Sequence, residues 1–390
     1  MKYSFCKKYF GLIFLLACIS CKKVVLVEST YKSKDAVFTN MLSLEVEESL
    51  SLSLDSITAP TSPTLQHIIR EGREMLAFWN NNDKSIIYFD LESGQVIDKQ
   101  FFETSGPNAV FATNFLIHSV DSIFMTDAVQ STYLVNSKSV VLEKYPVEDT
   151  YELKNSPGPY VWTGSPMTYV DGDIYFQGYI GGIFDQPNMA KLNLKAKEID
   201  YFSGYPEFYK KGYWRGGYEY MSYAYNPIRN LFVYSFVADH YVRVQSKNDL
   251  KSHNAYFGGT ADFQFLKPPR GKMGDPGGEK DERKFKLQPS FGLIHYDRFN
   301  DLYYRFAYDA LTESDLDSGD PLRSTIKPSR IIVLNSDFVK VGEHTLPRFK
   351  YNPKMSFTGK KGLYVMVKNE DNEDILEFDI FKPLPKDEKD

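Results

Sequence analysis

The amino-acid sequence predicts an all-β protein, a six-bladed β-propeller whose blades each contain four strands. Three observations favour this fold. A tight hairpin pattern occurs six times, a third strand ending in a polar turn follows each hairpin, and the chain of 390 residues contains 28 Tyr and 29 Phe. Tyr and Phe are enriched in strands. A four-stranded unit repeated about every 50 residues is typical of propeller blades.

Each predicted hairpin has an aromatic-rich strand, a polar turn and a strongly apolar strand. The six copies are residues 66–79, 115–126, 166–177, 221–235, 292–306 and 354–367. The turns that end the third strands contain Asp90, Asn136, Asn193, Gln245, Asn335 and Asp379. One interval is longer than the others because it contains two insertions rich in glycine, proline and charged residues, 258–286 and 312–328.

The sixth unit lacks a fourth strand, because the chain ends shortly after Asp379. An unassigned strand with alternating apolar residues lies near the other end, at residues 49–58. We expect this N-terminal strand to complete the last blade, which would close the ring and remove an exposed sheet edge. Two packed β-sandwich domains are the alternative, but they explain neither the six matched hairpins nor the missing strand.

The N-terminus has the pattern of a bacterial lipoprotein signal peptide. Lys residues precede the apolar run 9–20, which is too short to span a bilayer, since a spanning helix needs about 20 apolar residues. Cys18 and Cys21 both resemble a lipobox cysteine, and Cys21 is favoured because Ser20 precedes it. The alternative is a plain secretory signal peptide. The predicted parts are a signal peptide (1–21), a tether (22–47), a propeller (48–383) and a charged tail (384–390).

The net charge and the predicted lipid anchor limit the possible partners and the cellular location of the protein. The net charge of −5 argues against a nucleic-acid partner, which would need a basic face. The predicted lipid would hold the domain at a membrane of the cell envelope. Lys22 and Lys23 follow the cysteine without an acidic run, so we expect the periplasmic side rather than the cell surface. We also expect a monomer.

The first blades resemble a known family. The stretch 85–99 (SIIYFDLESGQVIDK), then Ser105-Gly106-Pro107-Asn108 and then 118–125 (HSVDSIFM) are similar to the Bacteroidota lipoproteins of domain-of-unknown-function family 4221. The resemblance extends over most of the chain after the tether. It implies a six-bladed propeller in a lipoprotein, and it assigns no activity to any residue.

The sequence contains no recognisable catalytic or metal-binding motif. The six His residues form neither His-x-His nor His-x-x-x-His, and no Gly-x-Ser-x-Gly or phosphate-binding loop occurs. His118 and His295 occupy matching positions in two hairpins, which indicates a structural role. We therefore predict no catalytic residue, no metal and no cofactor.

An aromatic-rich segment, residues 205–225, predicts a binding face. It joins the third and fourth units, and by propeller topology it lies on the face that also carries the connections between second and third strands. Aromatic rings near Arg and Asp suit a sugar or a peptide, although such aromatics could instead pack between blades. The candidate ligand-binding residues are Trp162, Tyr209, Tyr213, Trp214, Arg215, Tyr218, Asp239, His240 and Arg305.

The predicted function is a binding or scaffold module for a glycan, a peptide or a protein in the cell envelope. The alternative is a propeller hydrolase or lyase that acts on an envelope glycan or peptide. That enzyme would need Asp239, His240, Arg215 and Arg305 to converge at the mouth of the central channel.

Overall fold

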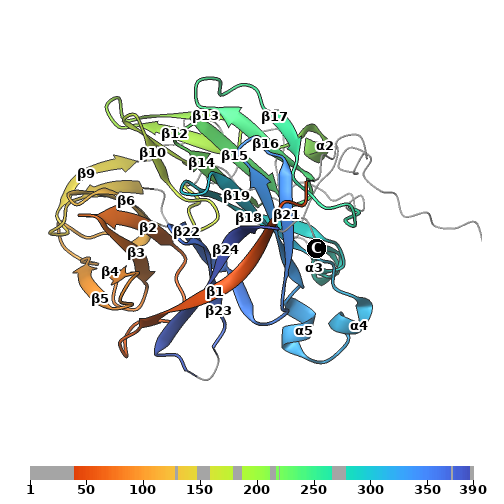
Figure 1. The fold of residues 1–390 in the computed structure, drawn as a ribbon. Helices are drawn as coiled ribbons and strands as arrows, with labels where there is room; N and C mark the ends of the chain where they lie inside the picture. The colour runs from red at the N-terminus through yellow and green to blue at the C-terminus, as the bar shows by residue number, and fades with distance from the viewer. Residues whose placement is uncertain are drawn as a thin grey trace, which may run out of the picture.

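The structure is a computed structural model, and it describes residues 39–127, 131–146, 159–178, 187–210, 217, 218, 220–265, 278–369 and 372–386. The described strands form six four-stranded antiparallel sheets, which confirms the predicted six-bladed propeller (Figure 1). Each sheet is one blade, and each predicted hairpin supplies its two inner strands.

The strand bounds are as follows. Blade 1 contains β2 (Leu65–Arg70), β3 (Arg73–Asn80), β4 (Ser85–Asp90) and β5 (Val96–Phe101). Blade 2 contains β6 (Ala112–Ser119), β7 (Ser122–Asp127), β8 (Ser131–Val135) and β9 (Val141–Pro146). Blade 3 contains β10 (Thr168–Val170), β11 (Asp173–Gln177), β12 (Met189–Asn193) and β13 (Glu198–Phe202). Blade 4 contains β14 (Met221–Asn226), β15 (Leu231–Phe236), β16 (Tyr241–Ser246) and β17 (Asn254–Phe257). Blade 5 contains β18 (Ser290–Asp297), β19 (Leu302–Tyr308), β20 (Ser329–Asn335) and β21 (Lys340–Leu346). Blade 6 contains β22 (Tyr351–Gly359), β23 (Gly362–Val367), β24 (Ile375–Pro385) and β1 (Leu42–Ser53).

The N-terminal strand closes the ring, as predicted. β1 pairs with β24 in antiparallel register from Leu42 opposite Pro385 to Ser53 opposite Ile375. Figure 1 shows β1, near the red end of the colours, beside the blue β24. The predicted boundaries need correction, because β1 begins at Leu42 inside the expected tether, and β24 ends at Pro385 inside the expected tail.

The reason for the earlier start is the burial of Leu44. Its side chain is 3% exposed and belongs to the apolar cluster between blades 5 and 6. The glutamates around it, Glu45, Glu47 and Glu48, are exposed and give this part of the strand the composition of a linker. Residues beyond Ser53 turn toward blade 1, where the Asp55 side chain accepts bonds from the backbone of Ile57 and Thr58.

The hydrophobic core fills the spaces between neighbouring blades. Clusters of buried residues join blade 1 to blade 2, blade 2 to blade 3, blades 3 to 5, blade 5 to blade 6, and blade 6 to blade 1. Aromatic side chains are frequent in these clusters, and Phe357 stacks on Tyr364 while Tyr175 packs against Phe232. Burial of large aromatic rings explains the high Tyr and Phe content.

The two predicted insertions carry short helices beside blade 5, and a further short helix, α2 (Glu207–Lys210), precedes blade 4. The first insertion contains α3 (Glu279–Lys286), and the second contains α4 (Glu313–Leu316) and α5 (Pro321–Thr325). Arg348 holds α4 and α5 together, because it donates to Asp315 Oδ1 at 2.9 Å and to the carbonyl oxygen of Arg323 at 2.8 Å. Within the described ranges, no helix is both long and apolar enough to cross a membrane.

The ring has two faces. The loop face carries the connections between successive blades, such as the described residues 203–210. The turn face carries the hairpin turns between the first two strands of each blade, such as residues 298–301. The innermost strand of every blade runs from the loop face to the turn face, so the central channel connects the two faces.

Candidate functional site: a cavity in the central channel

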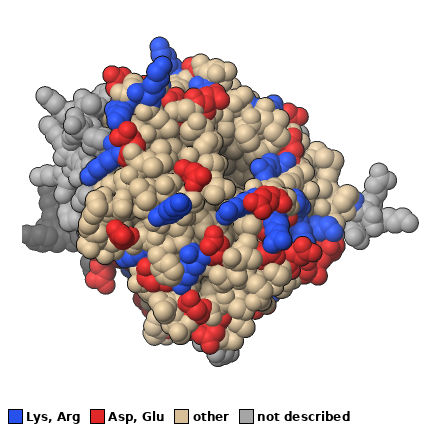
Figure 2. Space-filling model, turned by 90° about the vertical axis from the view of Figure 1, so that its left-hand side faces the viewer, with Lys and Arg blue, Asp and Glu red and all other residues tan. Residues whose placement is uncertain are grey.

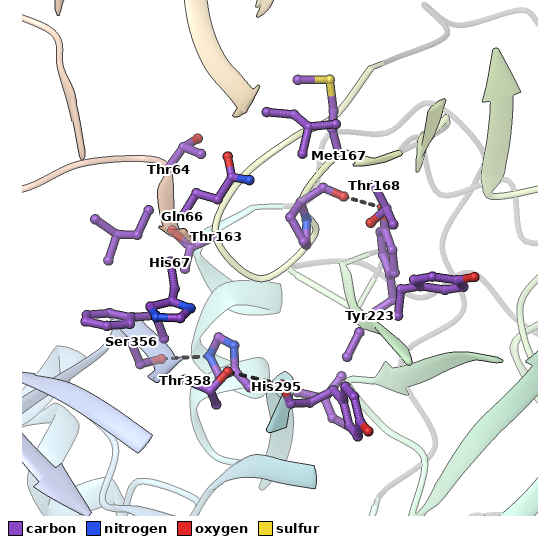
Figure 3. A pocket seen from close by; sticks show the side chains of 18 of the residues that line it. Thr64, Gln66, His67, Thr163, Met167, Thr168, Tyr223, His295, Ser356 and Thr358 are labelled. Carbon is purple, nitrogen blue, oxygen red and sulfur yellow. Dashed lines mark hydrogen bonds between the residues drawn. The ribbon is translucent and has the colours of Figure 1, made fainter. Parts of the chain in front are cut away.

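The innermost strands of all six blades line one cavity of about 400 Å³. This volume lies in the range of about 300–1,000 Å³ that is usual for small-molecule sites. Figure 3 shows His67 and His295 on one side of the cavity, and Thr168 and Tyr223 on the other. The lining includes aromatic rings, methyl groups, hydroxyls, two imidazoles, one amide and one guanidinium, and it contains no Asp or Glu.

The loop-face end of the cavity is closed by residues 160–166, which we call the strap. The strap precedes β10 and crosses to other blades. Thr163 donates both its backbone N–H and its hydroxyl to the carbonyl oxygen of Pro63, at 3.0 and 3.1 Å, which ties it to blade 1. The N–H of Tyr223 donates to the carbonyl oxygen of Gly164 at 3.0 Å, which ties it to blade 4.

Trp162 anchors the strap on the opposite side of the ring. Its indole is partly buried and packs against the apolar cluster of blades 5 and 6. Position 164, next to the Trp162 indole, requires glycine, because a Cβ atom there would lie 2.5 Å from the indole. Thr163 and Ser165 are buried, so the strap fills the channel at this end.

The turn-face end of the cavity is its mouth. Arg298 and Phe299, in the hairpin turn of blade 5, line the cavity and are exposed. The Phe299 ring lies edge-on to His67 with centroids 5.9 Å apart, and the His67 ring stacks parallel to Phe357 at 6.5 Å. These rings form one aromatic wall next to a cationic side chain.

His67 is held in a defined tautomer. Its Nε2 donates to Glu74 Oε1 at 2.8 Å, and the same oxygen accepts from the backbone N–H of Lys360 at 2.9 Å. Burial lowers the pKa of His67, although the bond to Glu74 opposes this effect. A neutral His67 that donates from Nε2 carries Nδ1 as a hydrogen-bond acceptor.

His295 lies deeper and is also neutral at pH 7. Burial lowers its pKa to about 4. Its Nε2 lies 2.8 Å from Ser356 Oγ, and Ser356 Oγ donates to the carbonyl oxygen of Pro353 at 2.7 Å. The serine proton is therefore directed at Pro353, and His295 is the donor to Ser356. This is the reverse of the polarity in a Ser–His nucleophile pair, and Ser356 is fully buried.

The other polar groups of the wall are bonded within the protein. Gln66 donates its amide N–H to the carbonyl oxygen of Ile117 at 2.9 Å and accepts from the Ile117 N–H at 2.7 Å. Thr358 donates to the carbonyl oxygen of Tyr296 at 3.1 Å, and Tyr223 donates to the carbonyl oxygen of Pro166. The wall is thus preorganised, and few of its donors are left for a ligand.

The structure brings three of the predicted site residues together, but in the interior between blades 4 and 5. Arg305 is fully buried, its guanidinium lies 3.8 Å from the centroid of the Phe291 ring, and it donates five hydrogen bonds. The acceptors are Ser235 Oγ and the carbonyl oxygens of Phe236, Asp239, His240 and Gly258. Burial lowers the pKa of Arg305 to about 9, so it remains charged at pH 7.

Asp239 and His240 are equally inaccessible. The Asp239 carboxylate accepts from Arg243 Nε at 2.7 Å, and the His240 ring packs between Phe257, Phe265 and Phe291. Burial lowers the pKa of His240 to about 4. Arg305, Asp239 and His240 expose no surface to solvent, and their contacts join two blades.

The remaining predicted residues fall into three groups. Tyr209 and Tyr218 are buried; the Tyr209 hydroxyl accepts from the Ala238 N–H at 2.9 Å, and the Tyr218 ring packs edge-on against Phe285. Tyr213, Trp214 and Arg215 lie outside the described residues, as does Cys21. Trp162 belongs to the strap.

The residues of the cavity were not predicted, although a signal for them existed. All six inner strands are the first strands of the repeated hairpins, so their side chains near the channel could have been aligned by repeat position. His295 was noticed in this way and was assigned a structural role. His118, its counterpart, packs against Tyr169 with centroids 3.8 Å apart and does not line the cavity. No group of three metal-ligating side chains occurs in the described parts of the chain.

Charged side chains of both signs are mixed on the surface. Figure 2 shows Lys and Arg side chains interspersed with Asp and Glu over one face of the molecule, without a field of one sign. Several of these charges are paired, such as Lys382 with Glu47 at 2.8 Å and Lys361 with Glu48 at 2.6 Å.

The fold and the cavity define a six-bladed β-propeller whose central channel is closed at one end. Residues 42–345 match the family described as "Domain of unknown function (DUF4221)". The chain therefore belongs to the DUF4221 family, which confirms the resemblance seen in the sequence. No curated protein matches it.

Two solved structures are similar to this chain. One is a DUF4221 family member from Bacteroides vulgatus, 24% identical, with a TM-score of 0.73 over 89% of this chain and 100% of that chain. The other is a candidate exported protein from Bacteroides fragilis, 10% identical, with a TM-score of 0.53 over 90% of this chain and 99% of that chain. At these identities, both similarities show the fold alone.

Proposed function

We propose that this chain is a binding propeller of the bacterial cell envelope, which holds a small glycan or peptide group in its central cavity. One observation carries the proposal: all six blades line a preorganised cavity that the strap closes at one end and that opens at exposed aromatic and cationic side chains. A wall whose polar groups are fixed by the protein loses little entropy on binding.

The alternative function, a hydrolase or lyase, has less support. Retaining and inverting glycosidases use a pair of carboxylates, and the cavity lining has none. The hydroxyl of Ser356 is bonded to the Pro353 carbonyl, so it is not activated by His295. Asp239, His240 and Arg305 are enclosed between blades, where a substrate does not reach them.

The location of the protein is part of the proposal. A lipid on Cys21 would anchor the domain, as a monomer, on the periplasmic side of an envelope membrane, with a membrane and a glycan, peptide or protein as its partners and no nucleic acid. Incorporation of labelled fatty acid by the full chain tests the anchor. Cys21→Ala should abolish the label and Cys18→Ala should not; the opposite result would assign the lipid to Cys18.

Thermal melting with a panel of small ligands tests the cavity. The panel contains neutral and acidic mono- and disaccharides, and di- and tripeptides. A ligand that raises Tm should lose its effect in Thr168→Trp, which fills the cavity, and keep it in Thr345→Trp, which places the same ring on an exposed position of β21. A ligand that acts equally on both variants, or a panel without any effect, would contradict a cavity site.

A further inference from the structure

We infer that the cavity takes an acidic sugar, with its carboxylate at Arg298 and its hydroxyls directed into the channel; this inference rests on the proposed function. It follows from the hydrogen-bonding groups that the wall leaves for a ligand. Each lining hydroxyl, amide or imidazole can be assigned its donors and acceptors from its contacts.

The hydroxyl groups of the inner wall donate their hydrogen bonds to acceptors within the protein. Thr163, Ser356, Thr358 and Tyr223 all donate to backbone carbonyl oxygens, and Thr64 donates to the Asn114 side chain. Lone pairs remain on these hydroxyl oxygens. The wall therefore offers acceptors to a ligand and matches a molecule rich in O–H donors.

The two imidazoles add to the same pattern. His67 donates from Nε2 to Glu74, and His295 donates from Nε2 to Ser356. Both rings are neutral at pH 7, so Nδ1 of each is a lone-pair acceptor. Imidazole acceptors favour a hydroxyl or another neutral donor, because the lining has no carboxylate to balance a cation.

The mouth differs from the interior, because it offers a charged donor. Arg298 is exposed, lines the cavity and has no carboxylate within 4.0 Å among the described residues. The nearest acidic neighbour in sequence, Asp297, is turned inward and accepts from Phe299 N–H, Asn300 and Tyr304. A guanidinium with free donors is suited to bind a carboxylate in bidentate geometry.

The aromatic wall at the mouth provides the third element. Phe299 lies next to the Arg298 guanidinium, 4.9 Å from ring centroid to guanidinium carbon, and edge-on to His67, whose other neighbour is the parallel Phe357 ring. The apolar face of a sugar ring can stack on such rings. A pyranose with one carboxylate matches all three features. Its apolar face can stack on the aromatic wall, its carboxylate can bind the single cation, and its hydroxyls can donate to the interior acceptors.

Isothermal titration of the purified domain with D-glucuronate, D-glucose and D-glucosamine tests this inference. We expect D-glucuronate to bind at least tenfold more tightly than D-glucose, and D-glucosamine to bind most weakly. Arg298→Gln should lower the D-glucuronate affinity at least tenfold and leave D-glucose binding unchanged. Arg73→Gln, an exposed arginine at the start of β3 in blade 1 that does not line the cavity, should change neither by more than twofold.

The outcomes separate the two proposals. Equal binding of D-glucose and D-glucuronate, both abolished by Thr168→Trp, would overturn the acidic sugar and leave the cavity site in place. D-Glucuronate binding that Arg298→Gln does not change would also overturn the inference. Absence of all sugar binding, together with a peptide whose effect on Tm requires the open cavity, would reject the sugar and keep the binding function.

Discussion

The hydroxyl of Ser49 donates a 2.6 Å hydrogen bond to Asp379 Oδ1, and so joins two residues that are 330 positions apart in the sequence. Ser49 lies in β1 and Asp379 in β24, where the two strands pair. The other oxygen of Asp379 accepts from Lys350 Nζ and Tyr351 Oη, both at 2.7 Å. One carboxylate thus connects the N-terminal strand to the inner part of the last blade.

Ring closure by β1 predicts a large stability loss from a single leucine in this strand. Leu52 is fully buried between blades 6 and 1. Leu52→Ala should lower the free energy of unfolding by about 2–5 kcal/mol, as usual for a buried leucine. Ser51→Ala, at the exposed neighbouring position, should change it by less than about 0.5 kcal/mol. Urea denaturation measures both, and equal stability of the two variants would show that β1 does not close the ring.

Arg305 predicts a second, independent effect on stability. Arg305→Ala leaves several buried carbonyl oxygens without a donor, and each unpaired group costs about 1–3 kcal/mol. We expect a loss of at least about 3 kcal/mol in urea denaturation, without a change in sugar binding by the folded protein. Arg323→Ala, an exposed arginine of α5, is the control and should have little effect. A normal stability of Arg305→Ala would mean that the residue is not a structural link between blades.

The depressed pKa of His295 predicts acid sensitivity. In the unfolded chain a histidine has a pKa near 6.5, whereas burial lowers the pKa of His295 to about 4. Between these values the unfolded state binds the additional proton, so stability falls as pH decreases from 6.5 toward 4.

Urea denaturation between pH 4.5 and 8 measures this dependence. His295→Gln should reduce the slope of unfolding free energy against pH below 6.5 by about one proton, or about 1.4 kcal/mol per pH unit. Thr168→Val, which removes no titratable group, should keep the slope of the parent protein. An unchanged slope in His295→Gln would show that this histidine does not stay neutral in the folded state.

The contact between Gly164 and Trp162 in the strap predicts that a substitution of Gly164 changes the environment of the Trp162 indole. Gly164→Ala places a Cβ atom against the Trp162 indole and should displace the ring from blades 5 and 6. We expect a lower Tm and stronger quenching of tryptophan fluorescence by acrylamide. Gly204→Ala, where a Cβ meets no atom within 4 Å, should affect neither. Similar quenching in both variants would mean that the strap does not depend on this contact.

The sequence predicted the architecture because each blade repeats one local pattern. Six hairpins, six polar turns and a missing fourth strand determine the number of blades and the closure. The sequence did not indicate the start of β1, because the glutamates near Leu44 give this segment the composition of a linker. Leu44 is buried through its contacts with blade 5, which are distant in sequence. Local composition cannot show a contact made across the ring.

The candidate site was predicted less well, for a related reason. Topology made Asp239, His240 and Arg305, with Arg215, candidates for the channel mouth, but it could not show that Phe291 and the carbonyl groups of blade 4 enclose the first three between blades. The cavity depends on a strap that crosses the channel, and nothing in residues 160–166 reveals that crossing. Whether Trp214 and Arg215 contact a ligand stays a prediction.

A crystal structure of the protein with D-glucuronate tests the acidic-sugar site in the cavity. We expect electron density for the sugar in the central cavity, between the His67 and His295 side and the Thr168 and Tyr223 side, with its carboxylate at Arg298 (Figure 3). Density for the sugar outside the channel, with the cavity occupied only by water, would contradict this site.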